Sequence, residues 1–98
     1  MNRVILSGRI TRDPSIINGN TTVANYTLAV DRDKENADFI SCVAFSKQAE
    51  FAEKYLKKGM KILVEGRINT GSYTDKNGKV VYTTDVIIDR HEFVEKKQ

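Results

Sequence analysis

Side chains able to catalyse a reaction or hold a metal are few and scattered in this sequence. Asp85 and Asp89 lie four residues apart and could share a face of one element, as the acids of a nuclease would. His91 is the only histidine and Cys42 the only cysteine. The sequence therefore offers no pair of cysteines or of histidines to bind a metal ion, and Cys42 has no partner for an internal disulfide. We therefore expect Cys42 to lie in the core, and we expect no catalytic residue, no metal site and no cofactor; a nuclease is the weakest alternative.

Binding chemistry is better represented, in the segment "SYTDKNGKVVYTT" at residues 72–84. Its central Asn-Gly pair is typical of a two-residue type I′ hairpin, in which facing residues have numbers that sum to 155. Tyr82 would then face Tyr73 and support its ring across the hairpin, a pair worth about 0.2–1 kcal/mol. Lys76 would face Lys79, and two facing lysines repel each other. Their presence would be explained by an anion bound between them or by a contribution to solubility. The pattern leaves open an ordinary hairpin and a polyanion-binding one.

Composition limits the class of protein. At 98 residues, with 40% hydrophobic and 30% charged residues, the chain has room for one small domain spanning residues 1–98. No apolar run approaches the length of about 18 residues that a membrane helix needs, and "MNRVILSGRI" resembles a strand more than a signal peptide. These features predict a cytoplasmic protein without a membrane partner. The net charge of +3 is compatible with a polyanion but does not require one.

Five segments have the period of strands and one has the period of a helix. The expected strands are residues 3–11, 21–30, 39–45, 61–73 and 80–89. The helix begins after Ser46, its expected N-cap, and ends before Gly59, its expected C′ residue. Five strands with a helix between the third and the fourth is the order of an all-β OB-fold barrel. The first strand is apolar on both faces, which predicts burial on both sides, more than a monomer would readily cover.

Five ordered blocks support this fold assignment through a family resemblance. They are "MNRVILSGRITRDP", "VANYTLAVDR", "ADFISCVAF", "AEKYLKKGMKILVEGRI" and "GSYTDKNGKVVYTTDVI". Together they resemble the bacterial single-stranded DNA-binding proteins of the replication fork over nearly the whole chain. The resemblance implies an OB-fold homotetramer that binds single-stranded DNA without sequence preference and breaks no bond. It implies a nucleoid-associated protein that protects and organises single-stranded DNA in replication, recombination and repair.

The same resemblance implies which residues bind the DNA. Aromatic side chains would stack on bases, and the basic ones would contact phosphates. By position the stacking residues are Phe39, Phe45 and Tyr73, and the basic residues are Arg3 at the first strand and Lys47 and Lys58 beside the binding path. The hairpin pattern, and not the resemblance, adds Lys76 and Lys79 at its tip as candidate contacts to an anion. Phe39 and Phe45 could instead be core residues, but residues 40, 42 and 44 on the opposite face of the same strand already supply its core side. Tyr26, which alternates with Leu28 and Val30, is expected in the core.

The sequence also departs from the family. It contains no tryptophan, and Ser41, Asn69, Gly71 and Ser72 stand where some members are basic. Members typically continue through a linker to an acidic tip that recruits replication and repair proteins, whereas this sequence stops at "EKKQ". We therefore expect a tailless relative or the core of a longer protein, without recruitment through such a tip. A primosome-type or protein-interaction OB module remains the alternative function.

Overall fold

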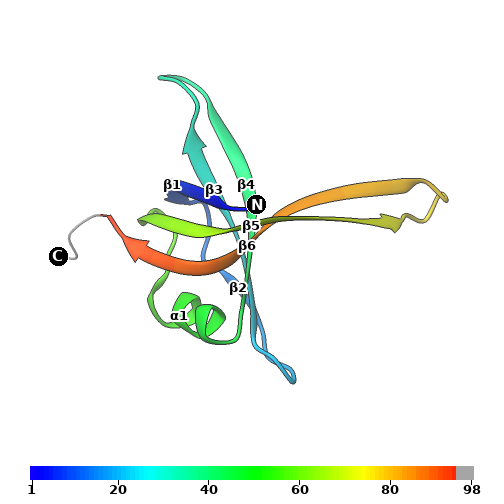
Figure 1. The fold of residues 1–98 in the computed structure, drawn as a ribbon, viewed down its shortest axis with the longest axis horizontal. Helices are drawn as coiled ribbons and strands as arrows, with labels where there is room; N and C mark the ends of the chain where they lie inside the picture. Colours follow the sequence, from blue (N-terminus) through cyan, green and yellow to red (C-terminus); the bar gives the residue numbers. More distant parts are fainter. Residues whose placement is uncertain (95–98) are drawn as a thin grey trace.

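Strands make up most of the computed structural model, which describes residues 1–94 (Figure 1). The elements are β1 (Val4–Ile10), β2 (Ser15–Ile17), β3 (Val23–Asp31), β4 (Ala37–Phe45), α1 (Lys47–Tyr55), β5 (Lys61–Thr74) and β6 (Val80–Phe93). The five long strands, with the helix between the third and fourth of them, confirm the expected all-β OB-fold order. The three-residue β2 is an addition, in a segment that the sequence presents as turns. The expectation based on "EKKQ" concerns residues outside those described.

The strands form one sheet that closes on itself. Their order is β1-β5-β6-β4-β3-β2, and β1 also pairs with β3 through Arg9–Ala29 and Ile10–Leu28. β4 and β6 run parallel, and the other pairs are antiparallel. At Gly66 the backbone of β5 lies so close to β6 that a Cβ atom would overlap the carbonyl group of Ile87. A glycine is therefore required where the barrel wall bends.

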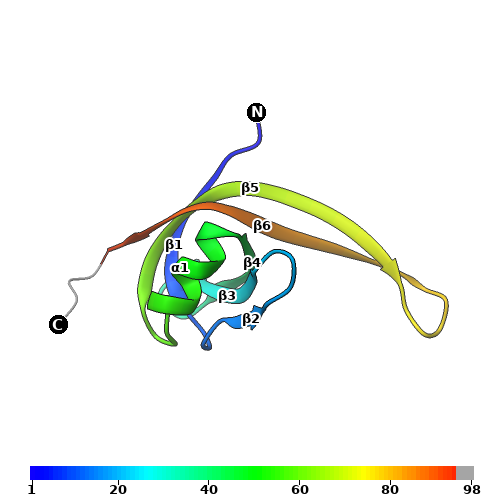
Figure 2. The ribbon, with the colours of Figure 1, turned by 90° about the horizontal axis from the view of Figure 1, so that it is seen from below.

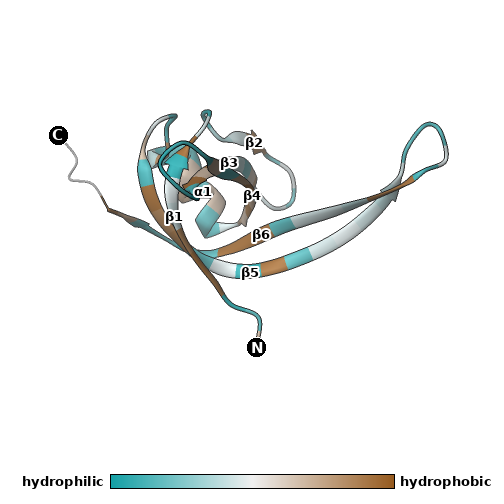
Figure 3. Cartoon of the chain, turned by 90° about the horizontal axis from the view of Figure 1, so that it is seen from above, coloured by the Kyte–Doolittle hydropathy of each residue, from teal (hydrophilic) through white to brown (hydrophobic). Residues whose placement is uncertain are grey.

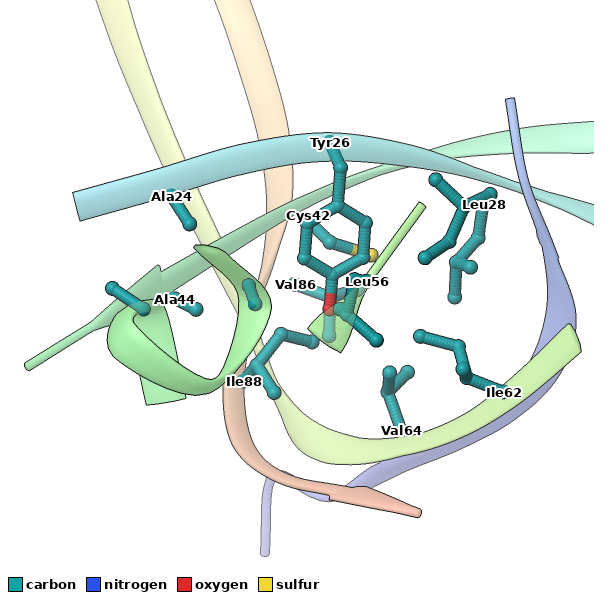
Figure 4. Packing of buried hydrophobic residues seen from close by; sticks show 13 residues of the cluster. Ala24, Tyr26, Leu28, Cys42, Ala44, Leu56, Ile62, Val64, Val86 and Ile88 are labelled. Atoms are coloured by element: carbon teal, nitrogen blue, oxygen red, sulfur yellow. The ribbon is translucent and has the colours of Figure 1, made fainter. Parts of the chain in front are cut away.

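The core lies inside this barrel and is built by alternation along the strands (Figure 4). The buried residues of β3 and β4 occupy alternate positions, and Tyr26 and Cys42 lie in the core as expected. Burial raises the pKa of the Cys42 thiol to about 12, which keeps it protonated and unreactive. The buried residues are Ile10, Ala24, Tyr26, Leu28, Cys42, Ala44, Ala49, Ala52, Leu56, Ile62, Val64, Val86 and Ile88.

Helix α1 packs on β3, β4 and β6 through the buried Ala49 and Ala52. Ser46 is the N-cap residue, as predicted, whereas Gly59 is not the C′ residue. Ser46 has a φ of 52° and its side chain makes no capping hydrogen bond; its backbone redirects the chain from β4 into the helix. The helix ends at Tyr55 because Leu56 becomes extended and buries its side chain, so Gly59, with a φ of 88°, lies in the following turn. No helix among residues 1–94 is long and apolar enough to cross a membrane.

Strand β6 continues four residues beyond its expected end at residue 89, because His91 has partners inside the fold. The His91 Nε2 atom lies 2.6 Å from the Tyr26 hydroxyl, and its Nδ1 atom lies 2.8 Å from Gln48 Oε1. The ring also stacks on Phe51, with centroids 5.2 Å apart, and Phe51 contacts Phe93. Burial lowers the pKa of His91 to about 4, so the imidazole is neutral at pH 7. This cluster fastens α1 to β3 and β6.

Candidate nucleic-acid interface

The end of the β5–β6 hairpin projects from the barrel as an arm, residues 69–85 (Figure 2). Its two strands pair along their whole length, and its tip is hydrophilic (Figure 3). The paired positions are Ser72 with Tyr82, Tyr73 with Val81 and Thr74 with Val80. Facing residues therefore have numbers that sum to 154, and the predicted sum of 155 is wrong by one residue.

Asp75 explains this register. Its carboxylate oxygen Oδ1 accepts hydrogen bonds from the backbone N–H groups of Asn77 (2.8 Å) and Lys79 (2.9 Å). Its backbone carbonyl accepts from Gly78, which has a φ of 81°. The loop thus contains three residues, in the turn-plus-bulge form that places a glycine in the left-handed region. Lys79 faces Asp75 and not Lys76, so the predicted repulsion between facing lysines is absent.

The one-residue change places the two tyrosines of the arm on opposite faces. Tyr73 is 57% exposed and stands opposite the half-buried Val81. Tyr82 is 81% exposed and stands opposite the small Ser72. The prediction that Tyr82 supports Tyr73 across the hairpin is therefore wrong.

The registers bring the three predicted stacking residues to one face. Val43 of β4 pairs with Ile87 of β6, and Tyr73 of β5 pairs with Val81 of β6, so residues at every second position from these share a side. We call this surface the outer face. It consists of Phe39, Ser41, Val43 and Phe45 of β4, Val81, Thr83, Asp85 and Ile87 of β6, and Arg67, Asn69, Gly71 and Tyr73 of β5. Phe39 and Phe45 are exposed on it, against the alternative that they are core residues.

The predicted cations do not all lie at this face. Lys47 lines a hollow beside Phe45, whereas Lys76 and Lys79 are at the tip of the arm. The Lys58 backbone N–H donates to the Asp13 carboxylate at 2.8 Å, which places it next to a second hollow that Asp13 lines with Ser41. The Arg3 guanidinium donates to Glu65 at 2.6 Å, and Glu65 also pairs with Arg90 at 3.4 Å, so the charge of Arg3 is only partly balanced.

Two arginines near the outer face were absent from the prediction. Arg12 lines the second hollow together with Ser41, Asn25 and Thr27, and no sequence pattern near it indicates this. Arg67 lines the hollow beside Phe45. Its position could have been found, because residues 67, 69, 71 and 73 have the period of two that puts them on the face of Tyr73.

The acids of the nuclease alternative do not form a site. Asp85 stands opposite Asn69, while Asp89 forms an ion pair with Arg67 at 3.6 Å. Within residues 1–94 no three side chains of His, Cys, Asp or Glu are grouped so that they could hold a metal ion. The arrangement offers aromatic rings, amides, hydroxyls and cations, which is chemistry for binding a polyanion with exposed bases.

Comparison with known proteins agrees with this chemistry. Residues 1–94 match the model of the single-strand binding protein family. The chain is 45% identical to the "Single-stranded DNA-binding protein" of Clostridium perfringens over 97% of its length and 67% of that protein's. It is 46% identical to "Single-stranded DNA-binding protein 1" of Staphylococcus aureus strain Mu50 (99% and 67%) and 47% identical to the corresponding Halalkalibacterium halodurans protein (97% and 61%). The chain thus spans about two-thirds of the length of these relatives. It belongs to the single-strand binding protein family.

Proposed function

We propose that this protein binds single-stranded DNA on the outer face, without sequence preference and without catalysis. The observation that carries the proposal is the common face of Phe39, Phe45 and Tyr73, which lie on two strands and project from the sheet. The names of the relatives and the family agree with it. The three rings would each offer a surface to whichever base arrives, because every base has a π-face.

The mechanism follows from the kinds of side chain present. Stacking contributes roughly 1–3 kcal/mol per base and is tolerant of sequence. Lys47, Lys58 and the tip residues Lys76 and Lys79 would neutralise phosphates, and Arg3 would contribute after its ion pair with Glu65 opens. The role that follows is to protect and organise single-stranded DNA during replication, recombination and repair. That ligand would place the protein in the cytoplasm, with the nucleoid.

The assembly that we propose is a homotetramer in which β1 is buried between subunits. Ile5 of β1 is an exposed apolar residue on one side of the strand, while Val4 and Leu6 are half-buried against the core on the other. Covering Ile5 with a second copy would remove apolar surface from water. Light scattering at micromolar concentration should therefore give four times the mass of one chain, and a monomer would contradict the assembly. β1 already pairs with β5 within one chain, so among residues 4–7 only the backbone N–H groups that point away from β5 should gain protection from hydrogen exchange on assembly.

Titration of labelled oligonucleotides tests the function. Oligothymidine and a mixed-sequence strand should bind with similar affinity, and binding should weaken with salt with a slope of about −0.7 for each phosphate neutralised. Failure to bind either strand, or an affinity independent of salt, would favour the alternative of a protein-interaction module.

A further inference from the structure

A hollow on the outer face joins the start of α1 to β5 and β6. Its lining includes Phe45, Lys47, Arg67, Ile87 and Asp89, and its volume is about 480 Å³. This volume lies within the usual range for small-ligand sites. The hollow therefore combines one aromatic ring, two cations and one anion in a space large enough for a nucleotide unit.

Asp89 reaches this hollow because β6 contains one extra residue here. The register shifts between Glu65 and Gly66, which face Arg90 and Ile88, so Asp89 has no facing residue on β5. Its Oδ1 atom lies 3.6 Å from Arg67 Nη1, and the two side chains are 59% and 54% exposed. An exposed ion pair of this kind is weak, because water and salt screen it. A stronger anionic ligand can therefore displace Asp89 from Arg67.

We propose that Arg67 is a phosphate-binding residue of the DNA path and that Asp89 competes with the DNA backbone for it. The inference rests on the proposed function: a nucleotide whose base stacks on Phe45 would carry its phosphodiester between Lys47 and Arg67. The guanidinium group suits this role, since its planar fork of donors binds two phosphate oxygens together. Asp89 thereby lowers the affinity for DNA, and a strand that enters the hollow displaces it from Arg67.

The test compares charge-neutral variants of the two partners. Arg67→Gln should weaken oligothymidine binding about tenfold, as loss of one charge-assisted contact does, and reduce the magnitude of the salt slope by about 0.7. Asp89→Asn should strengthen binding about two- to fivefold, the equivalent of a weak surface ion pair. The double variant should bind like Arg67→Gln alone, because Asp89 acts through Arg67.

Glu92→Gln is the matched control. Glu92 lies on the same strand, forms an exposed ion pair with Arg90 at the same 3.6 Å and carries the same charge as Asp89. Any gain from net charge alone would appear equally in Asp89→Asn and Glu92→Gln, and that equality would overturn the proposal. An unchanged affinity and salt slope in Arg67→Gln would also overturn it. If the parent protein itself fails to bind, the proposed function is wrong; if the parent binds and these variants behave like it, only the role of the Arg67–Asp89 pair is wrong.

Discussion

Replacing either tyrosine of the arm by alanine distinguishes its two faces. Tyr73→Ala removes a ring from the outer face, and Tyr82→Ala removes a ring from the opposite face of the same hairpin. The two changes are chemically identical and lie on facing strands, one position out of register. They should differ in DNA affinity if the strand follows the outer face.

The structure sets the size of each effect. Tyr73 has more than half of its surface accessible, enough for a base to stack, so its loss should cost roughly 1–3 kcal/mol per stacked base. That range corresponds to an increase in Kd of about 5- to 150-fold. Tyr82 faces only Ser72 and is 81% exposed, so Tyr82→Ala should lower the free energy of unfolding by less than about 1 kcal/mol and leave Kd unchanged.

Fluorescence anisotropy with labelled oligothymidine measures both Kd values, and thermal unfolding followed by circular dichroism checks that each variant folds. Tyr73→Phe serves as a further control and should bind nearly as well as the parent, since stacking uses the ring and not the hydroxyl. Equal losses in Tyr73→Ala and Tyr82→Ala would refute the assignment of the DNA to one face. Parent-like binding by Tyr73→Ala would refute the stacking role.

Three further predictions concern charge, pH and packing. Lys47→Ala and Lys58→Ala should each reduce the magnitude of the salt slope and weaken binding by a similar factor on every base sequence; a sequence-dependent loss would argue against phosphate contacts. Burial lowers the pKa of His91 from 6.5 to about 4, so the stability held by the neutral ring is complete above pH 6.5 and is lost as the pH falls towards 4. This loss should approach about 3 kcal/mol in urea titrations and be absent from His91→Phe; equal pH profiles would contradict it. Gly66→Ala should destabilise the fold by about 3 kcal/mol, because the new Cβ would overlap the backbone of β6. Gly71→Ala should cost much less, since the nearest neighbour of its new Cβ is the side-chain oxygen of Thr83 at 3.3 Å. Equal melting temperatures for the two variants would show that the barrel wall at Gly66 can relax.

Alternation along single strands made much of the fold and the interface predictable. On β4, the apolar positions 40, 42 and 44 oppose Phe39 and Phe45, and this period of two places both aromatic rings outside the core. Such a pattern is local, because each residue's side follows from its neighbours in sequence. The helix position was predictable for the same reason, through its change of period after residue 45.

The hairpin register and the end of β6 were mispredicted because both depend on side-chain hydrogen bonds, which the alternation of apolar and polar residues does not indicate. Asn77-Gly78 suggested a two-residue turn, but the Asp75 carboxylate bonds across the loop and extends it to three residues. Aspartate at the first position of a turn with glycine at the fourth was the available signal. The end of β6 was missed because His91 is polar, and its partners Tyr26 and Gln48 lie 65 and 43 residues away in sequence. Contacts between residues so far apart produce no pattern in the sequence around His91.

Photocrosslinking tests the central claim most directly, because it locates the DNA on the surface without a substitution. Ultraviolet irradiation of the protein with oligothymidine, followed by mass spectrometry of the digested complex, should give crosslinks at Phe39, Phe45 and Tyr73. Tyr82, which is more exposed than Tyr73, should remain unmodified. Crosslinks confined to Tyr82 or to the β1 strand would show that single-stranded DNA follows another surface and would contradict the account.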